Sequence, residues 1–309
     1  MNRTIPTSGS APRAVLSIGT NSSRALVATV DGGRMHVLFA QSTGTRLGEG
    51  LDARGAIGDV PMQRTLVALR KLAAEVGAYT SEVSVIATSA ARRASNAGDF
   101  AATVELTVGF PLHILSGKEE AEFSFLGATA GLPPARYGVV DVGGGSTEYA
   151  VGTSGHIESE RSIEIGAVRL TEAVPALNGV LGPVSQRDRA SARAIAHDRF
   201  QPLRGAPPAE RLMLVGGSAT TMISLREESR EPFLRSDVRA EEIDAMFERV
   251  CGLPLEQRRR LPGINPQRAD ILPGGLALLL VACALLDHGA ATVSTSDLLA
   301  GYLLAYGSP

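Results

Sequence analysis

The sequence predicts an α/β protein built from two similar lobes. A strand, a glycine turn and a second strand occur at residues 15–28 and again at 139–152, with an offset of 124 residues that aligns Gly19 with Gly143 and Ser22 with Ser146. Segments with helical spacing of apolar residues alternate with short β-rich runs along the chain. The 309 residues are enough for two domains of ordinary size, each with its own core.

The first half predicts a strand meander followed by mixed helices and strands. Three short β-rich runs within 13–40 are broken by glycine turns, which is typical of a meander. Ser116, with Glu119 three residues later, has the spacing of a capping box and predicts the start of a helix. The other predicted elements are a helix over 62–78, a strand within 82–90, a helix over 96–109 with Asn96 near its start, and a strand over 111–115.

The second half repeats the meander and then adds helices. Leu132, Pro133 and Pro134 end the preceding helix, so we expect one lobe over residues 1–127 and the other over 128–309. The predicted elements are strands within 138–165, a helix over 185–204, a strand within 211–221, helices over 240–251 and 274–287, a strand over 291–294, and a C-terminal helix over 296–309 that packs on the first lobe.

Composition favours a globular protein of a reducing compartment. The net charge of −2 gives no reason to expect nucleic acid or a membrane as a partner. Cys251 and Cys283 are too few for a disulfide framework, so a cytoplasmic setting is expected. Residues 1–15 lack the apolar stretch of a signal peptide and are expected to form a tail. The apolar run at 271–289 is interrupted by Pro273 and two glycines, which predicts a buried helix instead of a membrane span.

Three glycine turns follow apolar strands and suggest a phosphate site. They lie at 18–23, 143–147 and 215–221, and glycine backbone together with Ser and Thr hydroxyls can present donors to an anion. One such turn alone is more often a tight β-hairpin, but three together favour phosphate binding. Asp141 and Glu148 flank the second turn, so they could hold Mg²⁺ beside phosphate oxygens. The alternative is a turn-capping aspartate and a surface glutamate.

Charged pairs at two other places could contribute to the same site. Arg92 and Arg93 lie in a predicted loop after a strand, where a guanidinium fork could clamp phosphate, although such a pair is often only a solvated face. Glu119 and Glu120 open a helix near the lobe boundary, so one of them could face a cleft and accept a proton from water. The alternative is an ordinary helix-cap glutamate.

Eight motifs follow one another along the chain: "IGTNSSRALVA", "RLGEGLD", "ATSAARRASN", "ILSGKEEAEFSFLG", "VVDVGGGSTEYAVG", "IGAVRLTE", "LVGGSATT" and "RADILPGGLALLL". In order and spacing they resemble the exopolyphosphatase / guanosine pentaphosphate phosphohydrolase family of the actin-like ATPase and sugar-kinase superfamily. The resemblance covers residues 14 to 305 and matches the short two-domain form of the family.

The resemblance implies two ribonuclease-H-like lobes, each with a mixed five-stranded sheet flanked by helices, that face an active-site cleft. It also implies a phosphoric anhydride hydrolase that uses Mg²⁺, or another divalent cation, with a monovalent cation as an option. The substrate would be polyphosphate or guanosine pentaphosphate, and a homodimer is compatible with the family. The implied roles are Glu119 as general base, Asp141 and Glu148 as metal-side acids, and, as phosphate contacts, Asn21, Ser22, Arg92, Gly144, Gly145, Ser146 and Thr147.

Two positions depart from the family pattern. Ser17 stands where an aspartate is expected to help hold the metal, and Arg93 stands where an acidic residue is common. A serine brings no negative charge, so the site is expected to be more positive than usual. An active, slower enzyme is the leading hypothesis, because Glu119, Asp141 and Glu148 all remain. The alternatives are a non-catalytic sensor of polyphosphate or the alarmone, and a kinase of the same superfamily.

Overall fold

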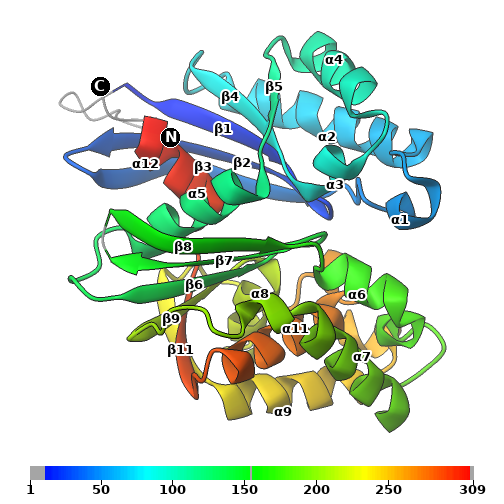
Figure 1. The fold of residues 1–309 in the computed structure, drawn as a ribbon. Coiled ribbons are helices and arrows are strands. Elements are labelled where there is room, and N and C mark those ends of the chain that lie inside the picture. The colour runs from blue at the N-terminus through cyan, green and yellow to red at the C-terminus, as the bar shows by residue number, and fades with distance from the viewer. Residues whose placement is uncertain (1–10, 154, 307–309) are drawn as a thin grey trace.

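The computed structural model describes residues 11–153 and 155–306, and the strands of this part form two mixed sheets stacked one above the other (Figure 1). Residues 1–10 of the expected tail and the last three residues of the expected C-terminal helix lie outside the described residues. The first sheet has the order β3-β2-β1-β4-β5 and the second β10-β11-β9-β6-β7-β8.

The strands of the first sheet are β1 (Arg13–Ile18), β2 (Ser22–Asp31), β3 (Arg34–Gly44), β4 (Val83–Ala87) and β5 (Leu112–Ile114). The strands of the second sheet are β6 (Tyr137–Val142), β7 (Thr147–Thr153), β8 (His156–Ile163), β9 (Arg211–Val215), β10 (Arg235–Arg239) and β11 (Ala290–Ser294). In each sheet the meander pairs antiparallel, and its first strand pairs parallel with a strand that comes later in the chain. The α/β fold class with two mixed sheets is therefore confirmed.

Helices cover both faces of the sheets. The longer helices are α2 (Asp59–Val76), α4 (Ala97–Val108), α5 (Gly117–Thr129), α7 (Gln186–Arg199), α8 (Gly217–Arg226), α9 (Ala240–Cys251), α11 (Leu272–Leu285) and α12 (Leu298–Tyr306). The shorter ones are α1 (Leu51–Arg54), α3 (Ser89–Arg93), α6 (Ala167–Ala173) and α10 (Leu255–Arg258). The predicted helices over 62–78, 96–109, 185–204, 240–251 and 274–287 correspond to α2, α4, α7, α9 and α11.

The second sheet has six strands where five were expected. The extra strand, β10, pairs antiparallel with β11 at the edge of the sheet. Its sequence is RSDVR, in which only Val238 is buried, so it has no apolar pattern that would indicate a strand. α8 also lies in a segment expected only as strand and turn, and it begins directly after the third glycine turn.

Two helices fill the space between the sheets. α5 packs on β6, β7 and β8, and α12 packs on α5, β1 and β2, so the two helices lie side by side at the centre of the molecule (Figure 1). Gly127 and Gly301 allow this close contact, because a Cβ at Gly127 would collide with the carbonyl of Asp297 and one at Gly301 with that of Phe123. The chain thus returns from the second sheet to the first through α12.

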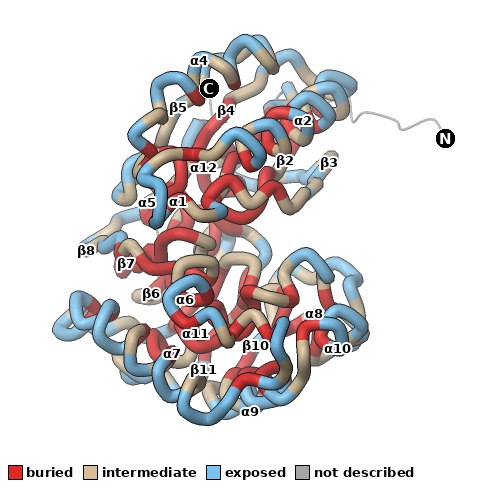
Figure 2. The backbone as a smooth tube through the Cα atoms, turned by 90° about the vertical axis from the view of Figure 1, so that its right-hand side faces the viewer, coloured by how far each residue is buried: buried red, intermediate tan, exposed pale blue. Residues whose placement is uncertain are grey.

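Burial is concentrated in the strands and in the central helices. The buried residues shown in Figure 2 cluster along the sheets, whereas the outer sides of α2, α4, α7 and α9 are exposed. α11, the apolar helix that contains Pro273, is almost wholly buried against α6, α7 and α9. In the described part of the chain, no helix has both the length and the apolar character needed to cross a membrane.

Candidate functional site

The two repeated hairpins have the same turn geometry. In the first, the N–H of Gly19 donates to the carbonyl of Ser22 at 2.9 Å, and in the second the N–H of Gly143 donates to that of Ser146 at 3.0 Å. Strand register adds a second correspondence, because Ser17 pairs with Arg24 in β1–β2 and Asp141 pairs with Glu148 in β6–β7. One hairpin therefore presents a serine and an arginine where the other presents two carboxylates.

The turns of the two hairpins touch each other, and glycine makes this contact possible. A Cβ at Gly145 would lie 2.5 Å from Oγ1 of Thr20 and 2.7 Å from Oγ of Ser89. A Cβ at Gly144 would lie 3.2 Å from the backbone nitrogen of Asn21. The glycines at this turn are needed for close approach, since neither adopts a positive φ.

The third glycine turn approaches the second hairpin from the side. Gly216 has a φ of +94°, and a Cβ there would lie 2.8 Å from Oδ1 of Asp141. α8 starts at the next residue, Gly217, so its first backbone N–H groups face the same region. Three turns from β1–β2, β6–β7 and β9–α8 thus meet at one place, as the three-turn pattern of the sequence predicts.

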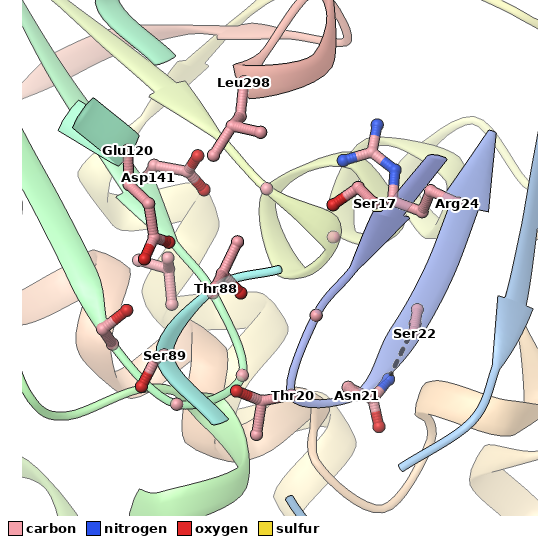
Figure 3. Close-up of a pocket in the computed structure, with 18 of the residues that line it drawn as sticks. Ser17, Thr20, Asn21, Ser22, Arg24, Thr88, Ser89, Glu120, Asp141 and Leu298 are labelled. Atoms are coloured by element: carbon pink, nitrogen blue, oxygen red, sulfur yellow. Dashed lines mark hydrogen bonds between the residues drawn. The ribbon is translucent and has the colours of Figure 1, made fainter. Parts of the chain in front are cut away.

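A cavity of about 100 Å³ lies where these turns meet. Figure 3 shows Glu120 and Asp141 on one side of it and Ser17 and Arg24 on the opposite side. The residues that line it come from both sheets and from α3, α5 and α12: Ser17, Gly19, Thr20, Asn21, Ser22, Arg24, Thr88, Ser89, Glu120, Asp141, Val142, Gly143, Gly144, Gly145, Ser146, Glu148, Gly216, Gly217, Arg268, Ile271, Leu298 and Leu299.

Three carboxylates form the acidic side of the cavity, and all three hold protons more tightly than usual. Burial raises the pKa of Glu120 to about 7, with Arg92 opposing the shift and Asp141 adding to it. Burial, followed by the charge of Asp297, raises the pKa of Asp141 to about 6, although Ser124 Oγ donates to its Oδ2 at 2.6 Å. Burial, together with Glu120 and Asp141, raises the pKa of Glu148 well above its usual range. Burial is the largest cause of the raised pKa for all three carboxyl groups.

Glu120, not Glu119, is the glutamate of α5 that faces the cavity. The Glu119 carboxylate accepts from the backbone N–H and from the hydroxyl of Ser116, both at 2.8 Å, and completes the predicted capping box. The backbone N–H of Ser116 lowers the pKa of Glu119, which does not line the cavity. Glu120 is 4% exposed and lines it. Of the two glutamates considered as a base, Glu120 is therefore the one at the cavity.

Two arginines form the basic side. Arg24 makes two hydrogen bonds with Asp297, at 2.7 and 3.1 Å, and Asp297 lies directly before α12. Arg268 donates to the hydroxyl of Ser22 at 3.2 Å, and burial together with the nearby Arg24 lowers its pKa to about 10. Ser17 is 5% exposed and lines the cavity next to Arg24. The basic side therefore presents a neutral hydroxyl beside Arg24 where the second hairpin presents two carboxylates.

The predicted phosphate contacts divide into two groups. Asn21, Ser22, Gly144, Gly145 and Ser146 all line the cavity. Within the described residues, the buried Oδ1 of Asn21 and the buried Oγ1 of Thr20 have no hydrogen-bond partner. These unused polar atoms are suited to a bound oxyanion or to water.

The remaining two predicted contacts are engaged elsewhere. Thr147 donates its hydroxyl to the carbonyl of Ile165 at 2.7 Å and does not line the cavity, so its hydroxyl stabilises the hairpin. Arg92 also lies outside the lining, because its guanidinium is bound by Glu120, by Glu164 and by the carbonyl of Leu115.

Arg93 does not make the cavity more positive. It lies on α3, in a segment expected as a loop, and forms ion pairs with Asp52 and Glu164. Its charge is therefore matched locally. Of the two departures from the family pattern, only Ser17 changes the cavity itself.

The donor set of the acidic side fits a hard divalent cation. In residues 11–153 and 155–306, no cluster of three or more His, Cys, Asp and Glu side chains is arranged to hold a metal. Mg²⁺ commonly takes only one or two protein carboxylates and completes its shell with water and substrate oxygens. Burial, followed by the charges of Glu120 and Asp141, raises the pKa of Glu148, and a bound cation would favour the ionised form of this carboxylate.

Several residues of the site were not identified from the sequence. Arg24 could have been found, because the offset of 124 residues aligns it with Glu148. Ser89, Arg268 and Asp297 come from segments far apart in the chain, and nothing in their local sequence indicates the cavity. Arg268 lies in one of the eight motifs but was given no role there.

Comparisons with known proteins agree with this architecture. The model of the Ppx/GppA phosphatase family matches residues 26–305. Exopolyphosphatase 2 of Mycobacterium tuberculosis is 31% identical over 315 residues, covering 94% of this chain and 97% of that protein. A solved exopolyphosphatase-like protein is 28% identical with a TM-score of 0.85, over 96% of this chain and 99% of its own. A solved exopolyphosphatase of Cytophaga hutchinsonii, at 24% identity, shares the fold with a TM-score of 0.86 over 96% and 99% of the two chains.

Proposed function

Because the chain belongs to the Ppx/GppA phosphatase family, we propose that it is an exopolyphosphatase that hydrolyses the terminal phosphate of inorganic polyphosphate, with guanosine pentaphosphate as a second substrate. The observation that supports this most strongly is the polarity of the cavity. Carboxylates suited to a base and a cation face Arg24 and Arg268, and three glycine turns lie between the two sides. Phosphoryl transfer depends on this kind of positioning and charge stabilisation.

The terminal phosphate of the substrate binds at the glycine turns. Oγ1 of Thr20 is buried without a partner in the described structure and can donate to a phosphate oxygen. The guanidinium group of Arg268 lies on the same wall and attracts the anion, whereas the charge of Arg24 is matched by Asp297. Because Gly144 and Gly145 carry no side chains, phosphate oxygens can approach the backbone N–H groups of the second turn.

Glu120 acts as the general base. Its carboxylate takes a proton from water while the water oxygen attacks the terminal phosphorus, the bridging P–O bond breaks, and the shortened chain leaves with the electron pair. A pKa of about 7 suits this step, because the group is about half ionised at pH 7, largely ionised at slightly basic pH, and still basic enough to accept the proton. Arg92 holds the Glu120 carboxylate in place.

Asp141 and Glu148 would hold Mg²⁺, or another divalent cation. When bound, the cation offsets the charge of the phosphate oxygens. Ser124 and Ser162 keep the two carboxylates oriented, since each donates a hydroxyl hydrogen bond, at 2.6 and 2.8 Å respectively. Ser17 supplies no charge to this arrangement.

A phosphate-release assay tests the proposal. Purified protein is incubated with polyphosphate of short and long chain length and with guanosine pentaphosphate, each with Mg²⁺ and with a chelator. The proposal predicts orthophosphate release from polyphosphate that stops in chelator. Absence of release from all of these substrates in Mg²⁺ would disprove it.

A second candidate is a sensor that binds polyphosphate or the alarmone without turnover. The specific observation in its favour is that the first hairpin presents Ser17 and Arg24 at the positions where the second presents Asp141 and Glu148. A more basic wall strengthens the binding of an anion and weakens the binding of a cation. Calorimetric binding without phosphate release, together with turnover in Ser17→Asp, would favour the sensor.

A further inference from the structure

An arginine cluster next to the cavity holds a carboxylate of the protein itself. The cluster consists of Ser89, Arg92, Arg93 and Arg169, and the carboxylate is that of Glu164, which follows β8. Nη2 of Arg92 lies 3.0 Å and Nε of Arg93 3.5 Å from the Glu164 carboxylate. Nη1 of Arg169 lies 3.4 Å from it, and the hydroxyl of Ser89 donates to it at 3.1 Å. Four donor residues, three from α3 and one from α6, therefore surround one anionic group.

The arginine cluster is fixed independently of Glu164. Arg92 is also bound by Glu120 and by the carbonyl of Leu115. Asp52 binds both Arg93 and Arg169, the latter at 2.9 Å. The side chains of the three arginines are only 17 to 23% exposed. The donors would therefore keep their places if the Glu164 carboxylate moved away.

Glu164 is held less firmly than the arginines. Its side chain is 42% exposed and lies in the short link between β8 and α6. Arg169 also donates to the backbone carbonyl of Glu164, so only the side chain would need to move. When it leaves, the three guanidinium groups keep the carboxylates of Glu120 and Asp52 as direct partners, and the charge of Glu172 also acts on Arg93 and Arg169. Its departure makes the cluster more positive by one charge and leaves donors of all three arginines open.

The arginine cluster adjoins the cavity directly. Ser89 lines the cavity and also donates to Glu164, and Arg92 contacts Glu120, which lines the cavity as well. The turn at Gly145 packs against the hydroxyl of Ser89. An anion bound at the glycine turns and an anion in the arginine cluster would thus be neighbours.

We propose that the arginine cluster is a second phosphate subsite that Glu164 occupies in the free protein, and that the next phosphate group of the substrate chain displaces Glu164 when it binds. The proposal deepens the proposed function and rests on it. Guanidinium forks bind phosphate oxygens in the way they bind carboxylates, through paired charge-assisted hydrogen bonds. Glu164 would therefore act as an internal competitor that sets the affinity for chains of two or more phosphates.

Calorimetry with a triphosphate whose bridging oxygens are replaced by methylene groups, in the presence of Mg²⁺, measures this competition without hydrolysis. Glu164→Gln keeps the size of the side chain and removes the competing charge. We expect its Kd to fall about tenfold, the factor equivalent to one charge-assisted hydrogen bond of about 1.4 kcal/mol. Glu158→Gln is the matched control, because Glu158 lies on β8, six residues before Glu164, and the change removes the same charge from an ion pair with Arg136. Its Kd should not change.

Orthophosphate is the second probe. A single phosphate needs only the glycine turns, so Glu164→Gln should leave its Kd unchanged. Arg169→Gln should weaken triphosphate binding. When it is combined with Glu164→Gln, it should remove the increase in triphosphate affinity that Glu164→Gln alone produces. The inference would be overturned if Glu164→Gln binds the triphosphate no more tightly than Glu158→Gln does. It would also be overturned if Glu164→Gln increases the affinity for orthophosphate by the same factor as the affinity for the triphosphate.

The calorimetric result separates this inference from the proposed function. If the wild-type protein releases no phosphate from polyphosphate while Glu164→Gln still tightens triphosphate binding, the hydrolase proposal fails and the competing role of Glu164 stands. If polyphosphate is hydrolysed but Glu164→Gln does not lower the triphosphate Kd, the hydrolase proposal stands and the competing role of Glu164 fails. A merely structural role of Glu164 would lower the melting temperature without tightening the Kd.

Discussion

Replacing Glu120 by Gln should make the protein more stable at basic pH while it removes the proposed base. The Glu120 side chain is 5% exposed, and its pKa rises from an ordinary value of 4.5 to about 7, mainly through burial. Below pH 4.5 the carboxyl group is protonated in both the folded and the unfolded chain. Between pH 4.5 and 7 only the unfolded chain loses the proton, so stability falls as pH rises.

The magnitude follows from the size of the pKa difference. Each pKa unit corresponds to about 1.4 kcal/mol, so the ionised Glu120 lowers the free energy of unfolding by about 3 kcal/mol above pH 7. Gln keeps the shape of the side chain and cannot ionise. We therefore expect the free energy of unfolding of Glu120→Gln to exceed that of the wild type by about 3 kcal/mol at pH 8.5, with a much smaller difference near pH 4.5.

Urea unfolding at these two pH values measures the effect, and Glu119→Gln is the matched control. Glu119 has a lowered pKa because its carboxylate accepts from Ser116, so its ionised form stabilises the fold above its ordinary pKa. Glu119→Gln should therefore be slightly less stable than the wild type at pH 8.5, the opposite sign. The reasoning would be refuted if Glu120→Gln is less stable than the wild type at pH 8.5. It would also be refuted if the free energy of unfolding differs from that of the wild type by the same amount at both pH values.

Three further predictions concern activity. The rate of phosphate release should rise with pH through about 7, because Glu120 must be ionised to accept a proton, and a rate that is flat between pH 6 and 8 would contradict this role. Ser17→Asp should lower the Mg²⁺ concentration needed for half-maximal activity, measured by metal titration, since it adds a carboxylate to the basic wall. Gly145→Ala should reduce kcat/KM at least about tenfold, because its Cβ would press on Thr20 and Ser89 and separate the two turns, and an unchanged value would show that this contact is dispensable.

Much of the fold could be predicted because its signals are local. The two hairpins share a turn that is visible in the sequence as Gly19 and Gly143 with Ser22 and Ser146, and the same backbone hydrogen bond forms in both. The capping box of α5 and the buried helix α11 also follow from short-range patterns. β10 could not be predicted, because its RSDVR sequence becomes a strand only through pairing with β11, more than fifty residues later.

The site was less predictable than the fold, because it depends on which side of an element faces the cavity. Glu119 and Glu120 are adjacent on α5, and successive residues of a helix point about 100° apart. The direction of each depends on how α5 packs between the two sheets, which is a tertiary property. Thr147 shows the same limit, since its hydroxyl donates to the carbonyl of Ile165, which comes 18 residues later in the chain.

The central claim, that Glu120 activates water in this cavity, is tested most directly by initial rates of orthophosphate release from long-chain polyphosphate in Mg²⁺. Loss of a general base lowers such rates by about 10²- to 10⁴-fold. The structure predicts a loss of that size for Glu120→Gln and near wild-type rates for Glu119→Gln, because only Glu120 lines the cavity. Retained activity in Glu120→Gln together with lost activity in Glu119→Gln would contradict the claim.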